Sequence, residues 1–153
     1  MNYSVLEINN LLRTLTVART DYWDTICPPT IVNTTIDFNL FSYSTTNATN
    51  LTLYYNCLVS ASAAAIFSPY ESIITPLDCQ INNTNSVNYY MNSTIQNLVG
   101  NALGICSYRV KVPVLAAAAQ TAELAATQAE VITAINGGFM LEWKANNTQC
   151  DEC

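Results

Sequence analysis

The chain lacks histidine and is poor in charged residues, and these absences narrow the functions open to it. It has 153 residues, no histidine and only 10% charged residues. Without histidine, neither a serine nor a cysteine catalytic triad of the usual kind can form. The few basic residues form no cluster and the net charge is −6, which argues against a nucleic-acid-binding surface. The sequence also has no glycine-rich phosphate loop, so we expect no kinase chemistry.

Long apolar runs are missing too. A membrane-spanning helix needs about 20 consecutive apolar residues. The apolar stretch 58–67 is shorter than this, and the alanine-rich stretch 115–135 carries Glu123 and Glu130. Residues 1–7 lack the basic start and apolar core of a signal peptide. We therefore predict neither a membrane span nor a signal peptide within this sequence.

Six cysteines in a chain without histidine indicate disulfides and not a metal centre. Only Cys150 and Cys153 have the spacing of metal ligands, and no second pair completes a four-ligand site. We predict no metal and no cofactor. A redox role for this pair is disfavoured because Asp151 and Glu152 oppose the thiolate.

All six cysteines are disulfide candidates: Cys27, Cys57, Cys79, Cys106, Cys150 and Cys153. Pairing of nearest neighbours joins Cys27 to Cys57 and Cys79 to Cys106. It is one of the fifteen connectivities that six cysteines allow, and the others stay open.

Seven asparagines begin the Asn-x-Ser/Thr pattern of an N-glycosylation site. They are Asn2, Asn33, Asn47, Asn50, Asn82, Asn92 and Asn146. Together with an even number of cysteines, they favour the secretory pathway, where disulfides persist and asparagines receive glycans.

The C-terminal third predicts a strand, a helix and a strand. Alternating side chains over 106–112 predict a half-buried strand, which should end at Pro113 because proline cannot donate to a ladder. Apolar residues recur with helical period over 115–135, which predicts one long alanine-rich helix. Residues 136–138 end it with glycines. Alternation over 139–143 predicts a second strand that this helix covers, with its tryptophan in the core.

The rest of the chain predicts further strands and a shorter helix. Four segments have strand character: 3–8, 11–19, 36–43 and 51–57. We expect the first two to form a hairpin around Asn9-Asn10, and the last two to pair with each other. An asparagine-rich loop over 79–92 should precede the shorter helix, from Asn92 or Ser93 to Leu103. The predicted class is α+β, an antiparallel sheet with one long and one shorter helix, stabilised by disulfides.

Catalysis has little support, whereas aromatic side chains offer candidates for ligand binding. Two carboxylate pairs could serve sugar hydrolysis, Asp21 with Asp24 and Glu123 with Glu130, but the second pair is expected on a solvated helix face. We predict no catalytic residues. Sugar rings stack on aromatic faces, so the candidate ligand-binding residues are Trp23, Tyr54, Tyr89 and Tyr90. A structural role for the tyrosines is the alternative.

Four fragments in a fixed order carry a family resemblance. They are Asn50-Leu-Thr-Leu-Tyr-Tyr-Asn-Cys57, Cys106-x-x-x-Val-x-Val-Pro-Val, Gly138-Phe-x-Leu-x-Trp143 and Cys150-x-x-Cys153. Over 27–153 the chain resembles the wall-associated receptor kinase C-terminal domain of plant leaf-rust-resistance-type receptor-like kinases. Residues 1–26 look like the tail of the galacturonan-binding domain that precedes it in that family. Family members continue with Ser-Gly-Gly-x-Cys-Gly, so the resemblance implies a domain truncated at its C-terminus.

The resemblance implies a non-catalytic module, extracellular or on the cell surface, that supports the sensing of pectin or another cell-wall polysaccharide. On this reading the chain is a truncated gene product or an excised piece of a receptor ectodomain. An acidic polysaccharide needs basic partners, and the chain offers Arg13, Arg19, Arg109, Lys111 and Lys144. The alternative function is a secreted glycoprotein that binds a protein partner, as a decoy or inhibitor does.

Overall fold

Two antiparallel sheets and two α-helices make up the part of the chain that the structure describes. The computed structural model describes residues 1–44, 47–58, 68, 74–79, 86–91 and 106–144. The elements are β1 (Tyr3–Asn9), β2 (Thr14–Arg19), the 3-10 turn η1 (Thr20–Tyr22), β3 (Phe41–Tyr43), β4 (Ala48–Leu58), β5 (Thr75–Leu77), β6 (Ser86–Met91), β7 (Cys106–Leu115), α3 (Ala116–Ala125), α4 (Gln128–Asn136) and β8 (Phe139–Trp143). The α+β class is confirmed.

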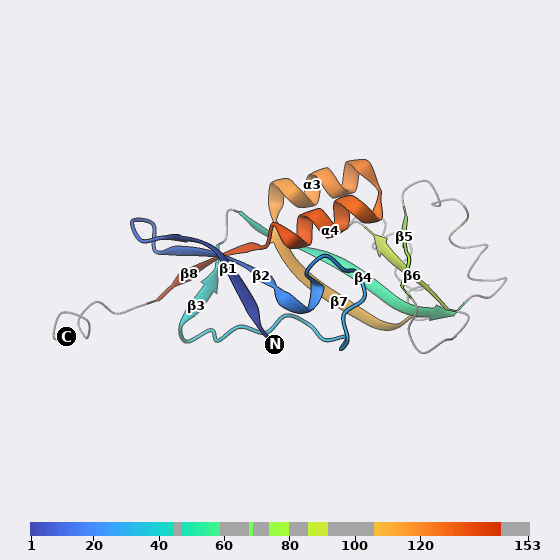
Figure 1. The fold of residues 1–153 in the computed structure, drawn as a ribbon, viewed down its shortest axis with the longest axis horizontal. Coiled ribbons are helices and arrows are strands. Elements are labelled where there is room, and N and C mark those ends of the chain that lie inside the picture. The colour runs from blue at the N-terminus through green and yellow to red at the C-terminus, as the bar shows by residue number, and fades with distance from the viewer. Residues whose placement is uncertain (45–46, 59–67, 69–73, 80–85, 92–105, 145–153) are drawn as a thin grey trace.

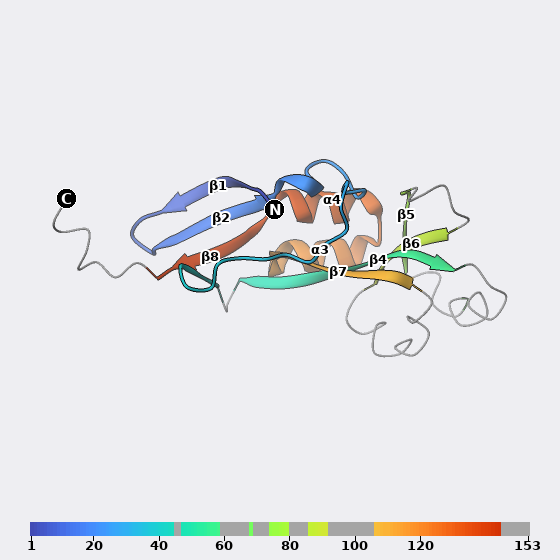
Figure 2. The same ribbon diagram turned by 90° about the horizontal axis from the view of Figure 1, so that it is seen from below.

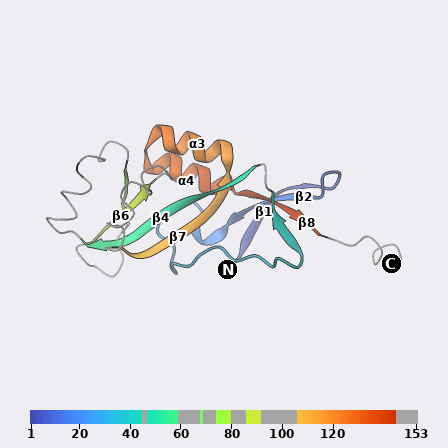
Figure 3. The same cartoon turned by 180° about the vertical axis from the view of Figure 1, so that it is seen from behind.

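The two sheets lie towards opposite ends of the long axis (Figure 1). One has the order β1-β2-β8-β3 and the other β5-β6-β4-β7. Helices α3 and α4 lie side by side over β4 and β7 of the second sheet (Figure 1). Seen from behind, β4 and β7 follow each other along their length beneath the helices (Figure 3).

The main core lies between this second sheet and the helices. Alternate residues of the two long strands face the helices: Leu51, Leu53 and Tyr55 from β4, and Val110, Val112 and Val114 from β7. They meet the helix residues Ala119, Ala122, Val131, Ala134 and Ile135. The alternation of side chains along β4 and β7 therefore positions the core.

A buried tyrosine pair joins this core to η1. The Tyr55 hydroxyl donates to the carbonyl of Ile26 at 2.8 Å and lies 3.2 Å from the Tyr22 hydroxyl. Burial raises the pKa of Tyr22 to about 12 and also raises the pKa of Tyr55. Both hydroxyls are therefore neutral at physiological pH and can share this hydrogen-bonded position.

The prediction of one long helix over 115–135 is wrong, because the chain forms a helical hairpin. Helix α3 ends at Ala125, and the next residue, Ala126, has the left-handed φ of 49°. Thr127 then caps α4, and its side chain accepts from the backbone N–H of Glu130. This Thr-x-x-Glu pattern is a helix-start signal that the continuous alanine periodicity obscured.

Strand β7 does not end at Pro113, as predicted, but continues to Leu115. It lies at the edge of its sheet, where a residue without an N–H is tolerated. The backbone N–H of Leu115 then donates to the carbonyl of Gly138 at 2.9 Å, which ties the end of β7 to the start of β8.

The strand over 139–143 and the pairing of the first two strands are confirmed, but the hairpin turn spans 10–13 and not Asn9-Asn10, and β2 begins at Thr14 and not at residue 11. The pairing of other strands differs from the predictions. Strand β8 belongs to the first sheet, between β2 and β3, and not to the sheet that the helices cover. Only Phe41–Tyr43 of the predicted strand 36–43 is a strand, and it pairs with β8, not with β4. Tyr89 and Tyr90 lie in strand β6 and not in a loop. The predicted helix over 93–103 lies outside the described residues.

Gly138 is the one place where the junction of β8 with β2 requires glycine. Its φ is 69°, and a Cβ there would lie 2.2 Å from the carbonyl oxygen of Val17. Both the left-handed backbone and the close approach exclude a side chain. The close approach of β8 to β2 therefore explains why the Gly-Phe-x-Leu-x-Trp fragment begins with glycine.

The described part of the chain contains two disulfides, and the nearest-neighbour pairing is wrong. The structure joins Cys57 to Cys106 and Cys27 to Cys79. Cys57 lies directly opposite Cys106 in the β4–β7 ladder, with 3.8 Å between their Cα atoms. A contact between neighbouring strands therefore decided the pairing, and proximity along the chain did not.

Non-reducing peptide mapping of the secreted protein should recover the fragments Cys57–Cys106 and Cys27–Cys79. Replacing Cys57 and Cys106 together by alanine should lower the free energy of unfolding by about 4 kcal/mol, since the bond spans 49 residues. Denaturant unfolding measures the loss. A fragment that links Cys27 to Cys57 would contradict the β4–β7 register.

The substitution Ala126→Gly should raise the free energy of unfolding by about 0.5–1 kcal/mol, because glycine adopts the left-handed conformation without steric cost. Its matched control is Ala125→Gly in the last turn of α3, which should lower the same free energy by about 1 kcal/mol. Urea titration of both variants tests the helical hairpin. A single continuous helix would be destabilised by both changes.

Candidate functional site

A cleft over the outer face of β7 is the candidate site, and we call it the basic cleft. Its volume is about 460 Å³, within the range of roughly 300–1,000 Å³ found for small-molecule sites. It is lined by Asn33, Thr34, Phe38, Tyr43, Asn50, Arg109 and Lys111. The lining comes from β3, β4, β7 and the segment before β3, so non-local contacts assemble it.

The register of β4 with β7 turns Arg109 and Lys111 away from the helices. Lys111 lies opposite Thr52 and Arg109 opposite Tyr54 in the ladder. Side chains alternate between the faces of a strand, so these two lie on the face opposite Val110 and Val112. With about 3.4 Å per residue, their Cα atoms are roughly 7 Å apart. Arg109 and Lys111 are therefore neighbours on the same face of β7.

One wall of the basic cleft is the segment 32–35, held against the open edge of β7. The backbone N–H of Lys111 donates to Asn33 Oδ1 at 2.9 Å, and Thr34 Oγ1 donates to the Lys111 carbonyl at 3.3 Å. Figure 2 shows the chain between η1 and β3 running next to β7. The side chains of Asn33 and Thr34 thus satisfy the backbone N–H and carbonyl of Lys111, as a neighbouring strand would do at this open edge.

Arg19 fixes this wall from behind. Its side chain is fully buried and forms an ion pair with Asp21 at 2.7 Å. The same guanidinium donates to Thr34 Oγ1 at 3.1 Å and to the carbonyl of Val32 at 3.0 Å. It also lies 4.6 Å from the centre of the Tyr22 ring. One buried cation therefore connects the end of β2 to the wall of the cleft.

Aromatic side chains form another part of the lining of the basic cleft. Phe38 is 59% exposed, and its ring meets that of Tyr43 edge to face, with 6.0 Å between the centroids. Lys144 Nζ donates to the Phe38 carbonyl at 2.9 Å. Burial raises the pKa of Tyr43, and the charge of Arg19 opposes the rise. The neutral Tyr43 hydroxyl can donate or accept a hydrogen bond.

The basic cleft is positive in a chain that is negative as a whole. It holds two of the five basic residues, whereas the net charge of the chain is −6. No carboxylate is found among the described residues that line it. The Arg109 guanidinium also lies 5.7 Å from the centre of the Tyr54 ring. The cleft can therefore receive an anion that brings polar hydroxyls and an apolar face with it.

The aromatic residues predicted to bind a ligand do not form one site. Trp23 follows η1 and is 44% exposed, whereas Tyr54 and Tyr90 are buried. Tyr54 lies opposite Tyr89, but Tyr90 lies on the other face of β6. None of the four lines the basic cleft. Contact of these four residues with a ligand stays a prediction. Trp143, which was predicted to lie in the core, is half-buried at the end of β8.

Tyr90 lines a smaller cleft of about 290 Å³ beside α3. This second cleft also takes in Asn50 and Glu123. Burial, and to a lesser degree the charge of Glu123, raises the pKa of Tyr90, so its hydroxyl stays protonated.

The carboxylates considered for hydrolysis have structural partners or lie apart. Both oxygens of Asp21 accept from Arg19. Asp24 Oδ1 accepts from Asn136 Nδ2 at 2.6 Å. Glu123 and Glu130 lie on different helices, α3 and α4. Across the described ranges, no group of three metal-ligating side chains lies together, and no helix is long and apolar enough to cross a membrane.

Four of the predicted glycosylation sites are described, and all four are exposed: Asn2, Asn33, Asn47 and Asn50. The other three, Asn82, Asn92 and Asn146, lie outside the described residues, as do Cys150 and Cys153. Exposure is what an oligosaccharide attached to asparagine requires. Glycosylation itself stays a prediction.

The alternation predicted over 106–112 puts Arg109 and Lys111 on the same face of their strand, but the rest of the basic cleft was not predicted. The predicted strand 36–43 contains Phe38 and Tyr43, but its predicted pairing with β4 would not bring them to this cleft. The period-2 alternation of β7 was the available signal for the two cations. The aromatic side of the cleft had no local signal, since it depends on the pairing of β3 with β8.

One comparison with known proteins gave a match. The family model described as wall-associated receptor kinase C-terminal matches residues 77–153. The matched range contains β6, β7, β8 and both α-helices, and thus Arg109 and Lys111 of the basic cleft. No curated protein and no solved structure matches the chain.

The substitution Arg19→Met should lower the free energy of unfolding by about 3 kcal/mol, since it leaves Asp21 without its partner. It should also loosen the cleft wall, so the backbone amide of Lys111 should exchange its hydrogen faster. Denaturant unfolding measures the change in stability, and hydrogen exchange measures the exchange rate of the Lys111 amide. Arg13→Met, at an exposed arginine in the β1–β2 turn, is the control and should change neither. Unchanged Lys111 exchange in Arg19→Met would refute the role of Arg19 in holding the wall.

Proposed function

The chain belongs to the wall-associated receptor kinase C-terminal family, and we propose that it is a non-catalytic extracellular module that supports the sensing of pectin in the plant cell wall. The family match supports the extracellular, receptor-associated setting. The residues of the basic cleft support the choice of an acidic polysaccharide. Exposed glycosylation sites and two disulfides are in keeping with a secreted protein.

The observation that carries the proposal is the pair Arg109 and Lys111 in a cleft that also offers aromatic rings and amides. Charge-assisted hydrogen bonds between a cation and a carboxylate are about twice as strong as neutral ones. A polymer of galacturonate presents one carboxylate on each sugar, so neighbouring cations can engage it repeatedly.

The remaining lining suits a sugar chain. Phe38 and Tyr43 present aromatic surface against which the apolar face of a sugar ring can pack. Asn33 and Asn50 present amide groups that can donate to and accept from hydroxyls. The cleft thus combines charge with the mixed surface that a uronic acid needs. Binding without turnover fits the structural roles of Asp21 and Asp24.

The N-terminal residues belong to the proposed site as well. Residues 1–26, which resemble the tail of a galacturonan-binding domain, form β1, β2 and η1 and contribute Arg19. Strand β2 pairs with β8 of the matched range. We propose that this segment supports the basic cleft.

A protein partner is the second candidate function, and the β1–β2 hairpin is the observation that favours it. Five apolar side chains of this hairpin are exposed: Val5, Leu6, Ile8, Leu11 and Leu12. Exposed apolar patches of this kind mark interaction surfaces in many proteins. Pull-down from cell-wall extracts separates the candidates, because pectinase removes a pectin ligand and leaves a protein ligand in place.

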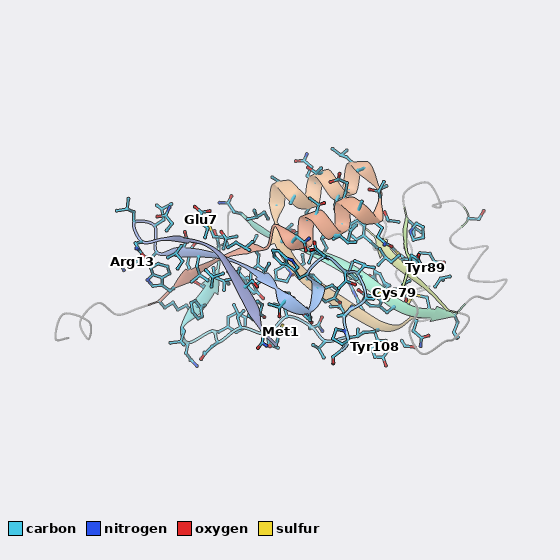
Figure 4. All side chains as sticks on the ribbon, viewed as in Figure 1. Met1, Glu7, Arg13, Cys79, Tyr89 and Tyr108 are labelled. Carbon is cyan, nitrogen blue, oxygen red and sulfur yellow. A yellow bond between two sulfur atoms is a disulfide. The ribbon has the colours of Figure 1, made fainter. Side chains whose placement is uncertain are left out.

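The substitution Lys111→Gln should weaken binding of oligogalacturonides at least about tenfold, since one charge-assisted contact contributes about 1.5–3 kcal/mol. Isothermal titration with the enzymatically deglycosylated protein measures it, and methyl-esterified oligomers should bind more weakly than the free acids. Arg13→Gln changes the net charge equally and is the matched control. Figure 4 shows Arg13 at the tip of the hairpin, at the far end of the molecule from Tyr89.

Equal affinity of Lys111→Gln and the unaltered protein would refute this site. Absence of any heat with the unaltered protein would refute pectin binding itself.

A further inference from the structure

Two predicted glycosylation sites lie on the rim of the basic cleft. Asn33 and Asn50 are 17 positions apart in the sequence, yet both line this one cleft. Asn50 comes from β4, on one side of β7, and Asn33 comes from the segment held against the other edge of β7. The two asparagines therefore flank the strand that carries Arg109 and Lys111.

The hydrogen bond of Asn33 is compatible with a glycan and fixes where it starts. Its Oδ1 accepts from the backbone N–H of Lys111 at 2.9 Å. An N-linked glycan is attached through Nδ2, so Oδ1 can keep this bond after attachment. The first sugar at Asn33 would thus begin next to Lys111, in a direction set by the β7 backbone.

Asn50 is a second predicted glycosylation site that lines the same cleft. It lies opposite Pro113 in the ladder and is exposed. It also lines the cleft of about 290 Å³ beside α3 and a third one of about 150 Å³ near Tyr43. An oligosaccharide at this position is bulky, strongly hydrated and surrounded by concave surface on several sides.

We propose that N-glycans at Asn33 and Asn50 form a shield over the basic cleft, and that their occupancy determines whether a polyanion can reach Lys111. The part of this proposal that concerns a polyanion reaching Lys111 rests on the proposed function. The covering of the cleft by glycans does not. Two further exposed sites, Asn2 and Asn47, do not line the cleft. Glycans there leave Lys111 accessible. Asn47 accepts the N–H of Ala116 at the start of α3 through its backbone carbonyl, which places it beside the helices.

The test compares three forms secreted from a eukaryotic host: the unaltered protein, Thr35→Ala combined with Asn50→Gln, and Asn47→Gln. Thr35→Ala removes the Asn33 glycosylation site and keeps the Asn33 side chain with its bond to Lys111. Asn50→Gln removes the Asn50 site and keeps a side-chain amide in the cleft lining. The Thr35 side chain is exposed, so its loss is tolerated. Intact-mass measurement reads glycan occupancy, and matching thermal melts establish that all three forms are folded.

Acetylation by an amine-reactive ester, followed by peptide mass spectrometry, then measures access to Lys111. Lys144 is the only other lysine and serves as the internal reference. Lys111 should be acetylated several-fold faster, relative to Lys144, in the double variant than in the unaltered protein. Asn47→Gln should behave as the unaltered protein does. Equal rates in all three forms, or unoccupied Asn33 and Asn50 in the unaltered protein, would overturn the shield.

A second measurement separates the shield from the proposed function. Oligogalacturonide should bind the double variant more tightly than the unaltered protein and Asn47→Gln. Faster acetylation of the double variant with no oligogalacturonide binding in any form supports the shield and refutes pectin binding. Equal acetylation with binding in all forms refutes the shield and supports pectin binding.

Discussion

The pairing of β4 with β7 is the constraint on which the rest of the structure depends. The ladder runs from Ala48 opposite Leu115 to Cys57 opposite Cys106. It brings Leu53 and Val110 under the helices, and it turns Lys111 to the other face. A slip of this register by one residue would exchange the two faces, burying the cations and exposing the core residues. The disulfide at the end of the ladder holds the register covalently.

Local patterns in the sequence were sufficient to predict several elements but not how they pair. Alternation located β7 and β8, and the N-terminal hairpin was predicted although its turn lies a few residues later than Asn9-Asn10. The helical hairpin was missed because alanine favours helix equally on both sides of Ala126, so periodicity could not mark the break. The capping pattern at Thr127 was the signal that could have found it. Partners such as β3 with β8, or Cys27 with Cys79, are separated by long stretches of chain that no local pattern reads.

The site was predicted in part for the same reason. The polar face of β7 follows from alternation, so Arg109 and Lys111 could be placed together. The aromatic candidates were chosen by residue type, and burial of Tyr54 and Tyr90 could not be foreseen, because β4 and β6 have neighbours on both sides in their sheet. Arg19 would be expected at the surface from its charge alone. Its burial depends on Asp21, two residues on, and on the distant Thr34 and Val32.

Both described disulfides lie outside the first sheet. One joins β4 to β7, and the other joins the chain after η1 to the chain after β5. In the described residues, the strands β1, β2, β8 and β3 are joined to one another only by hydrogen bonds and side-chain packing. Under mechanical load or heat, this sheet is therefore the unit that can separate while the crosslinked half stays intact. Since Arg19 ends β2, such a partial opening would remove the support of the cleft wall first, so tension on the molecule would change the basic cleft before the core unfolds.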